Sequence, residues 1–159
     1  MFDIHALYRA LDAQRCRRGM SWQEMAREVG GVSPATLTGL RARSSVEGDG
    51  VLQMLRWLGR TPESFVPGHP AAATGEATLP RADPSQTLRF DAKAIYAALD
   101  SRRLERAMTW QQVAKEIGAV NAAGLTRMAQ GGRVSFPSVM RIFGWLGRPA
   151  ADFIRVSAW

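Results

Sequence analysis

The fold of this chain is decided by Ser21-Trp-Gln-Glu-Met-Ala-Arg-Glu-Val-Gly-Gly-Val-Ser-Pro-Ala-Thr-Leu-Thr-Gly-Leu40. Ser21 and Glu24 form the pattern of a capping box, in which side chains satisfy the free N–H groups at a helix start. Apolar residues at three- and four-residue spacing follow, so the predicted helix has one buried face. Gly30 ends this helix, because glycine adopts the positive φ of a helix C-cap without strain.

A second helix is predicted after the glycine turn. Ser33 is suited to cap its first turn, and Pro34 fits the first helical position. Leu37 and Leu40 then form its buried face. Two short helices joined by a tight turn are typical of a helix-turn-helix. The alternative is an ordinary helical hairpin in a small bundle.

The chain contains this stretch twice. Adding 88 to each number gives a second copy that starts at Thr109, in which Asn121 takes the capping role of Ser33. The first repeat, residues 2–66, and the second repeat, residues 90–154, align without a gap, and about 25 of the 65 paired positions are identical. This pattern predicts an internal duplication of a whole domain.

Each repeat is predicted to hold five short helices. A helix from Asp3 to about Gly19 precedes the helix-turn-helix, and a fourth helix follows it, with Ser135 as its predicted N-cap in the second repeat. One short helical turn then ends the repeat. The sequence has no alternating strand pattern, so we expect an all-α fold.

Residues 67–89 separate the two repeats and contain four prolines and two glycines. Their composition predicts a flexible linker between one domain at 1–66 and another at 90–159. A flexible coil of 23 residues spans on the order of 25–30 Å. That length is close to the roughly 34 Å between successive major grooves on one face of DNA. Both domains can therefore sit on one duplex.

The chain is basic, with a formal net charge of +7. Most of the excess lies in residues 90–159, which carry ten lysines and arginines against five acids. Arginine outnumbers lysine by 19 to 2, and arginine makes forked contacts with phosphates and guanine edges. The charge therefore favours a nucleic-acid partner, with arginines that merely solvate the surface as the alternative.

Cysteine usage and hydropathy give expectations about the compartment. The single cysteine, Cys16, cannot form an internal disulfide, so we expect a small buried apolar side chain in a reducing environment. No apolar run reaches the length of a transmembrane helix, and the first residues lack the features of a signal peptide. A soluble, cytoplasmic protein is expected.

The pattern Met20-Ser-Trp-Gln-Glu-Met-Ala26, followed by Val29-Gly30 and Val32-Ser33, resembles the Cro and phage-repressor (XRE-type) helix-turn-helix family. The segment from Val134 to Gly147 is similar to the fourth helix of that family. The resemblance implies two tandem five-helix lambda-repressor-like domains that bind double-stranded DNA. In that family the second helix of the motif enters the major groove.

The resemblance also implies which residues contact DNA. Residues on and just beyond the second helix of each motif would face bases, while Gln23 and Gln111 would contact phosphates. Arg127 alone is placed and shaped to read guanine, so the second repeat is expected to be the better reader. The implied set is Gln23, Ser33, Thr36, Thr38, Arg41, Arg43, Gln111, Asn121, Thr126, Arg127, Gln130 and Arg133.

Two features of the motif depart from the family. The turn is one residue longer than usual, because Gly31 and Ala119 are inserted. Trp22 and Trp110 stand where a polar phosphate-binding residue is common. A longer turn is expected to tilt the second helix of the motif.

A repeated tryptophan, Trp57 and Trp145, is a third departure. It stands beside the buried face of the fourth helix, at a position that is often small in the family. We expect a core residue. The alternative is an interface anchor for another chain, since tryptophan is enriched at binding hot spots.

Two classes of function remain open. The favoured one is a non-enzymatic transcriptional regulator that binds double-stranded DNA without a cofactor. The alternative is a protein-interaction module, like an anti-activator or antitoxin, that pairs with itself or another regulator; no membrane partner is expected. His5 and His69 do not recur, and no metal set or nucleophile–base group appears. Asp12 and Asp100 recur, as helix-surface charges.

Overall fold

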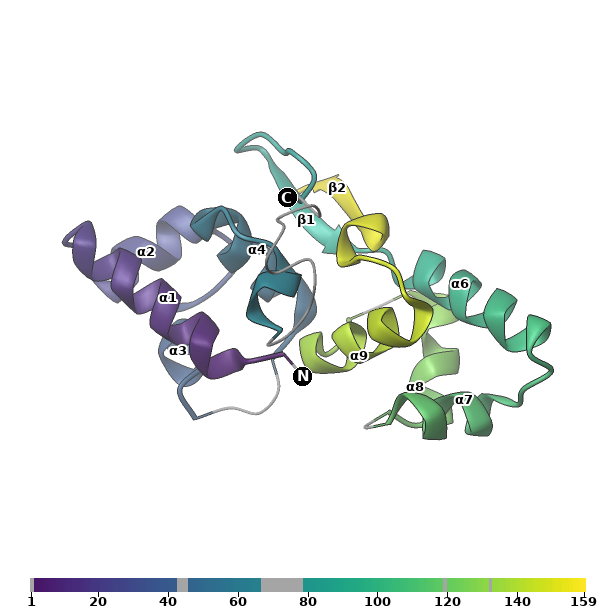
Figure 1. Ribbon diagram of the computed structural model, residues 1–159. Coiled ribbons are helices and arrows are strands. Elements are labelled where there is room, and N and C mark those ends of the chain that lie inside the picture. The colour runs from purple at the N-terminus through teal and green to yellow at the C-terminus, as the bar shows by residue number, and fades with distance from the viewer. Residues whose placement is uncertain (1, 43–45, 67–78, 119, 132) are drawn as a thin grey trace.

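The structure is a computed structural model that describes residues 2–42, 46–66, 79–118, 120–131 and 133–159. These residues form a mainly α-helical fold with one small sheet (Figure 1). The elements are α1 Ile4–Arg17, α2 Trp22–Val29, α3 Pro34–Gly39, α4 Gly48–Leu58, the 3-10 helix η1 Pro62–Phe65, β1 Gln86–Phe90, α6 Ala92–Glu105, α7 Trp110–Ile117, α8 Ala122–Arg127, η2 Met128–Gln130, α9 Phe136–Leu146, η3 Ala150–Phe153 and β2 Ile154–Ala158.

Apart from η2, which occurs in the second repeat, the described helices of the two repeats have the same bounds once 88 is added. Ile4–Arg17 becomes Ala92–Glu105, for example, and Gly48–Leu58 becomes Phe136–Leu146. The five helical segments predicted in each repeat are confirmed. Their predicted apolar faces are also buried, including Leu37 and its equivalent Leu125.

Side-chain caps fix the start of the motif helices. Ser33 Oγ accepts from the Thr36 N–H, and Asn121 Oδ1 accepts from the Gly124 N–H. Thr109 and Gln112 form a complete capping box. Ser21 caps α2 in the same way, but the Glu24 carboxylate accepts from the Ser21 hydroxyl rather than from its backbone. The caps were therefore predictable, although only the second box is reciprocal.

The expectation of an all-α fold is confirmed only in its coarser form, a mainly helical fold, because β1 and β2 add a small antiparallel sheet. Their register pairs Gln86 with Ala158 and Phe90 with Ile154. Residues 86–89, expected within the flexible linker, thus belong to a strand, and Leu88 is fully buried. Residues 67–78 of that segment lie outside the described residues.

The sheet packs on α4 of the first repeat through side chains that bind its backbone. Gln53 donates to the Leu88 carbonyl at 2.7 Å, and the Arg56 guanidinium donates to the carbonyls of Gln86, Ala82 and Asp83. The described part of the predicted linker is therefore held against the first repeat rather than free.

The two repeats are joined by equivalent backbone segments. The Gly48 N–H donates to the Val134 carbonyl at 2.8 Å, and the Phe136 N–H donates to the Val46 carbonyl at 2.8 Å. Val46 and Val134 are equivalent positions, as are Gly48 and Phe136. The two bonds are thus exchanged copies of one contact, which is the pattern of a two-fold interface.

Aromatic rings fill the joint between the repeats. Phe136 is fully buried, with its ring centroid 4.4 Å from that of Phe2 and 5.8 Å from that of Phe90. The equivalent Gly48 leaves the room for this packing, since a Cβ there would lie 2.9 Å from Phe90 and 3.0 Å from the Val134 carbonyl oxygen. Gly48 therefore leaves room for the Phe90 ring, which in turn packs on Phe136 at the interface of the two repeats.

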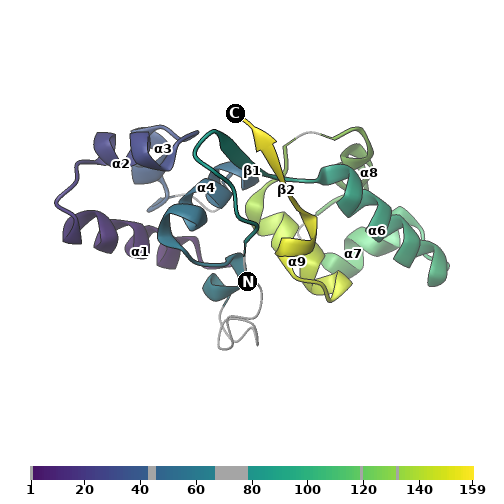
Figure 2. The ribbon, with the colours of Figure 1, turned by 90° about the horizontal axis from the view of Figure 1, so that it is seen from above.

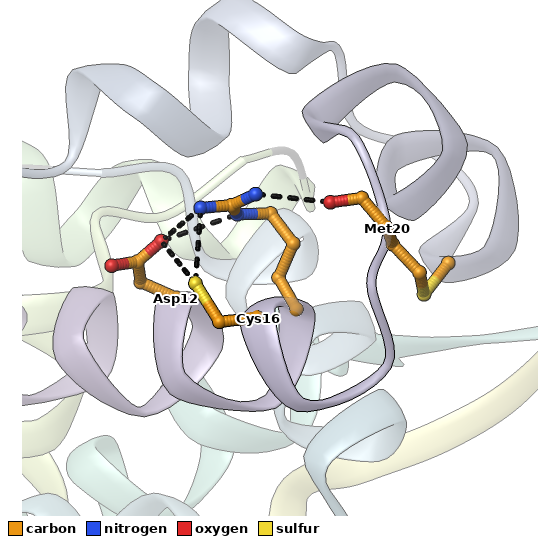
Figure 3. A network of polar contacts seen from close by, with 4 residues as sticks. Asp12, Cys16 and Met20 are labelled. Atoms are coloured by element: carbon orange, nitrogen blue, oxygen red, sulfur yellow. Dashed lines mark hydrogen bonds and ion pairs between the residues drawn. The ribbon is translucent and has the colours of Figure 1, made fainter.

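Cys16 is exposed, so the expectation of a buried side chain is wrong. Position 16 faces outward on α1, and its equivalent Leu104 is 62% exposed. The Cys16 sulfur lies beside Arg15, which binds Asp12 at 2.7 Å and donates to the Met20 carbonyl at 2.9 Å (Figure 3). Asp12 therefore holds the arginine that ties α1 to the next turn.

The second repeat contains the same arginine contacts. Arg103 binds Asp100 at 2.6 Å and donates to the Met108 carbonyl at 3.1 Å. Both aspartates are partly exposed on their helices, as expected of surface charges, and each also orients a more deeply buried arginine.

None of the described helices is long and apolar enough to cross a membrane.

Candidate nucleic-acid interface

The helices α3 and α8 are the second helices of the two motifs. Figure 1 places both in the lower part of the molecule, and Figure 2 places both along its upper edge, so the two views agree that they lie on one side. They stand toward opposite ends of that side, with the joint of the repeats between them. The second helices of both motifs therefore lie on the same side of the molecule.

The exposed surface of α3 consists of small side chains. The Ser33 hydroxyl bonds that of Thr36 at 2.9 Å, and the Thr38 hydroxyl donates to the Pro34 carbonyl at 3.1 Å. These predicted contact residues are at the surface, but their hydroxyls already have partners within the helix. Arg41, just beyond α3, is exposed, and Arg43 lies outside the described residues.

The exposed surface of α8 offers longer side chains. Arg127 is exposed at its last residue, and Gln130 and Arg133 are exposed after it. The Oδ1 of the exposed Asn121 caps the helix, and the Thr126 hydroxyl donates to the Ala123 carbonyl. Three of the predicted contact residues here thus have long side chains at the surface.

The hollow beside α8 has a volume near 370 Å³ and was not predicted from the sequence. Arg127 and Arg133 lie at its charged side, and Met128, Val139 and Ile142 are among its apolar lining. Its lining residues all lie between Val120 and Ile142, but the sequence pattern does not show how the residues of α8 and α9 are arranged around it.

The first helices of the motifs present Gln23 and Gln111 to solvent, as expected for phosphate contacts. The neighbouring Trp22 stacks on Tyr8 at 5.7 Å between ring centroids, and the Arg15 guanidinium lies 4.6 Å from its ring. Trp110 makes the same stack with Tyr96. Trp22 and Trp110 therefore pack against the aromatic ring of a tyrosine in their own repeat.

Trp57 and Trp145 are half-buried under arginines of their own repeat. Arg18 lies 5.7 Å from the Trp57 ring, and Arg106 lies 5.7 Å from the Trp145 ring. Arg106 also pairs with Glu116 at 2.8 Å, and this hydrogen-bonded pairing holds the pKa of that carboxyl below its ordinary value. This packing fits the core expectation, and the interface alternative stays a prediction.

The turn of the first motif is covered by the end of the chain. The Trp159 indole donates to the Pro84 carbonyl at 2.9 Å, and its ring lies against Gly30 and Gly31. Gly31 has a φ of +71°, which favours glycine, and a Cβ there would lie 2.9 Å from that ring. Ala119, the inserted residue of the second turn, lies outside the described residues.

Among the described residues no group of three metal-ligating side chains occurs. Comparisons of the chain with family models, with curated proteins and with solved structures found no match.

Proposed function

We propose that this chain is a sequence-specific, non-enzymatic regulator that binds double-stranded DNA through two fused lambda-repressor-like helix-turn-helix domains. The observation that carries the proposal is the pair of capped, exposed helices α3 and α8 on one side of the molecule. A helix of this kind fits the major groove, where base edges can be read. The net charge of +7 supplies attraction to phosphates.

In this proposal the two repeats of one chain contact DNA as the two subunits of a dimeric regulator do. The exchanged bonds of Gly48 and Phe136 relate the repeats by an approximate two-fold. A two-fold protein matches two half-sites of inverted orientation, about 10 bp apart from centre to centre. The preferred DNA is then an inverted pair of half-sites rather than a direct repeat.

The two half-sites are expected to differ in their information content. Arg127 on α8 has the forked guanidinium that matches the O6 and N7 atoms of guanine, whereas the equivalent residue on α3 is Gly39. The hydroxyls of α3 are engaged within their own helix. The α8 half-site should therefore be well defined, and the α3 half-site should be loosely defined.

The salt dependence of DNA binding tests the proposal. Fluorescence anisotropy of a labelled duplex should show log affinity falling linearly with log salt, with a slope of about −0.9 for each phosphate contact. A selected duplex should bind on the order of a thousandfold more tightly than a scrambled duplex of equal length. Micromolar or weaker binding to both duplexes at low salt would contradict the proposal.

A protein-interaction module is the second candidate function. The small, internally bonded side chains of α3 favour it, because they provide a smooth surface with few free donors. Under this reading the first repeat contacts another regulator or a second chain. Full retention of a partner protein by a variant with weakened DNA binding, such as Arg127→Ala, would separate this function from the first.

A further inference from the structure

A second hollow of about 370 Å³ lies where the sheet meets the start of α6. Four basic side chains from distant parts of the chain line it: Arg89 on β1, Arg155 on β2, Lys93 in the first turn of α6 and Arg133 beyond η2. No ion pair is formed by any of these four side chains within the part of the chain that the structure describes.

Two of these cations are forced together by the register of the sheet. Arg89 and Arg155 are directly paired across the antiparallel ladder. Directly opposed residues have Cβ atoms about 4.5–5.5 Å apart, and like charges at such a pair are destabilising. The charge of the Asp49 carboxylate interacts favourably with both arginines and offsets part of this repulsion. An anion bound between them would offset the rest.

The carboxylates that line the same hollow are already engaged with backbone donors. Asp49 accepts from the Phe90 N–H at 2.9 Å, and Asp91 caps α6 by accepting from the Ala94 N–H at 3.1 Å. Neither carboxylate forms an ion pair with the four cations in the described structure. The lining therefore keeps two positive charges more than negative ones.

We propose that the cluster of Arg89, Lys93, Arg133 and Arg155, here called the basic hollow, is a phosphate-binding site. A phosphate group has enough oxygens to accept forked hydrogen bonds from more than one guanidinium at once. A single carboxylate ligand has only two oxygens and would satisfy fewer of these donors. The volume exceeds that of a lone phosphate and fits the lower range of ligand pockets.

Two sources of the phosphate fit this site. Gly131 and Arg133 line both the basic hollow and the hollow beside α8, so a DNA strand read by α8 can reach the site with its backbone. The other source is a free phosphorylated small molecule that acts as an effector. Only the first source rests on the proposed DNA-binding function.

Calorimetric titration of the full-length protein with inorganic pyrophosphate tests the site without DNA. Saturable binding at one site is expected, and Arg155→Gln should weaken it about tenfold, as loss of a charged hydrogen bond does. Arg9→Gln, an exposed arginine on α1, is the matched control and should bind as the parent does. Circular dichroism establishes that both variants are folded; if Arg155→Gln is not, Lys93→Gln takes its place.

The same variants in a DNA titration identify the source. If the site holds a DNA phosphate, Arg155→Gln lowers the salt slope by about 0.9 while Arg9→Gln leaves it unchanged. Pyrophosphate binding with an unchanged slope supports a free phosphorylated ligand, and it does so even if the chain binds no DNA. Absence of pyrophosphate binding together with an unaltered DNA slope, or with no DNA binding at all, would overturn the proposal.

Discussion

Arg127 and Gly39 occupy equivalent places on the two motif helices, and they differ more than any other pair there in what they can contact. Arg127→Ala should weaken binding to the selected duplex by about 1–3 kcal/mol and relax the preference at one base pair, because a forked guanine contact is lost. Competition with single-base variants of the duplex measures both effects. Arg17→Ala, on the exposed end of α1, is the control, and equal selectivity of the two variants would contradict the assignment.

Arg103 has a structural role, unlike the general phosphate contact that a basic helix end suggests. It joins Asp100, the Met108 carbonyl and the ring of Trp110, whose centroid lies 4.9 Å away. Arg103→Ala should lower the free energy of unfolding by about 1–2 kcal/mol through these lost contacts, while the order of preferred DNA sequences is kept. Urea unfolding measures the first effect; a change of sequence preference with unaltered stability would refute this role.

Asp49 makes stability depend on pH. Burial raises the pKa of its carboxyl above the ordinary 3.8, against the hydrogen bond from Phe90. A raised folded-state pKa means that ionisation favours the unfolded chain, so stability falls as pH rises from 3.8 to the folded pKa. Asp49→Asn keeps the acceptor oxygen and should be more stable than the parent at pH 7 but equal to it below pH 3.8. Urea unfolding at both pH values checks this, and an advantage confined to low pH would contradict it.

At the scale of elements, helices were predictable and strands were not. Caps such as Ser33 and Thr109, and apolar periods such as that of α2, are local signals, so the helix bounds could be placed from the sequence. The strand Gln86–Phe90 owes its existence to a partner at Ile154–Ala158, which no local pattern specifies. The prolines that precede this strand in the sequence predicted a flexible linker instead.

In the candidate site, too, local sequence patterns place the helical residues but not the contacts between distant segments. The exposed residues of α3 and α8 could be placed, because helical period and caps fix which side faces out. The basic hollow could not be found, since Arg89 and Arg155 meet only through the sheet register. The role of Asp12 was also missed, because its partner Arg15 looks like any other surface arginine in sequence.

Leu88 distinguishes a structural strand from a free linker. It is fully buried on β1, so Leu88→Ala should cost about 2–5 kcal/mol of unfolding free energy. Arg81→Ala, at an exposed position of the preceding segment, is the control and should stay within about 0.5 kcal/mol of the parent. Denaturant unfolding measures both. A Leu88→Ala protein as stable as the parent would mean that the segment is a free linker after all.

At the scale of the whole molecule, the two repeats share one core. Phe136 of the second repeat packs on Phe2 of the first, and buried Glu63 accepts from the Ala150 N–H at 2.7 Å across the joint. Separation of the repeats would expose these groups, so each repeat by itself is expected to be unstable. This differs from the picture of two independent domains on a flexible linker.

Cooperative unfolding should therefore include both repeats. Calorimetry of the intact chain should give one transition whose calorimetric and van't Hoff enthalpies agree. Phe136→Ala should lower the free energy of unfolding by about 3–5 kcal/mol, because it empties the centre of the joint. Two separate transitions in the parent protein, one for each repeat, would contradict a shared core.

We propose that one chain reads two inverted half-sites, and selection of bound duplexes from a random DNA pool by the purified protein tests this most directly. We expect an enriched site with two inverted half-sites whose centres are about 10 bp apart. One half-site should be sharply defined and should lose its definition in Arg127→Ala. Enrichment of no sequence, or of two half-sites in direct repeat, would contradict the proposal.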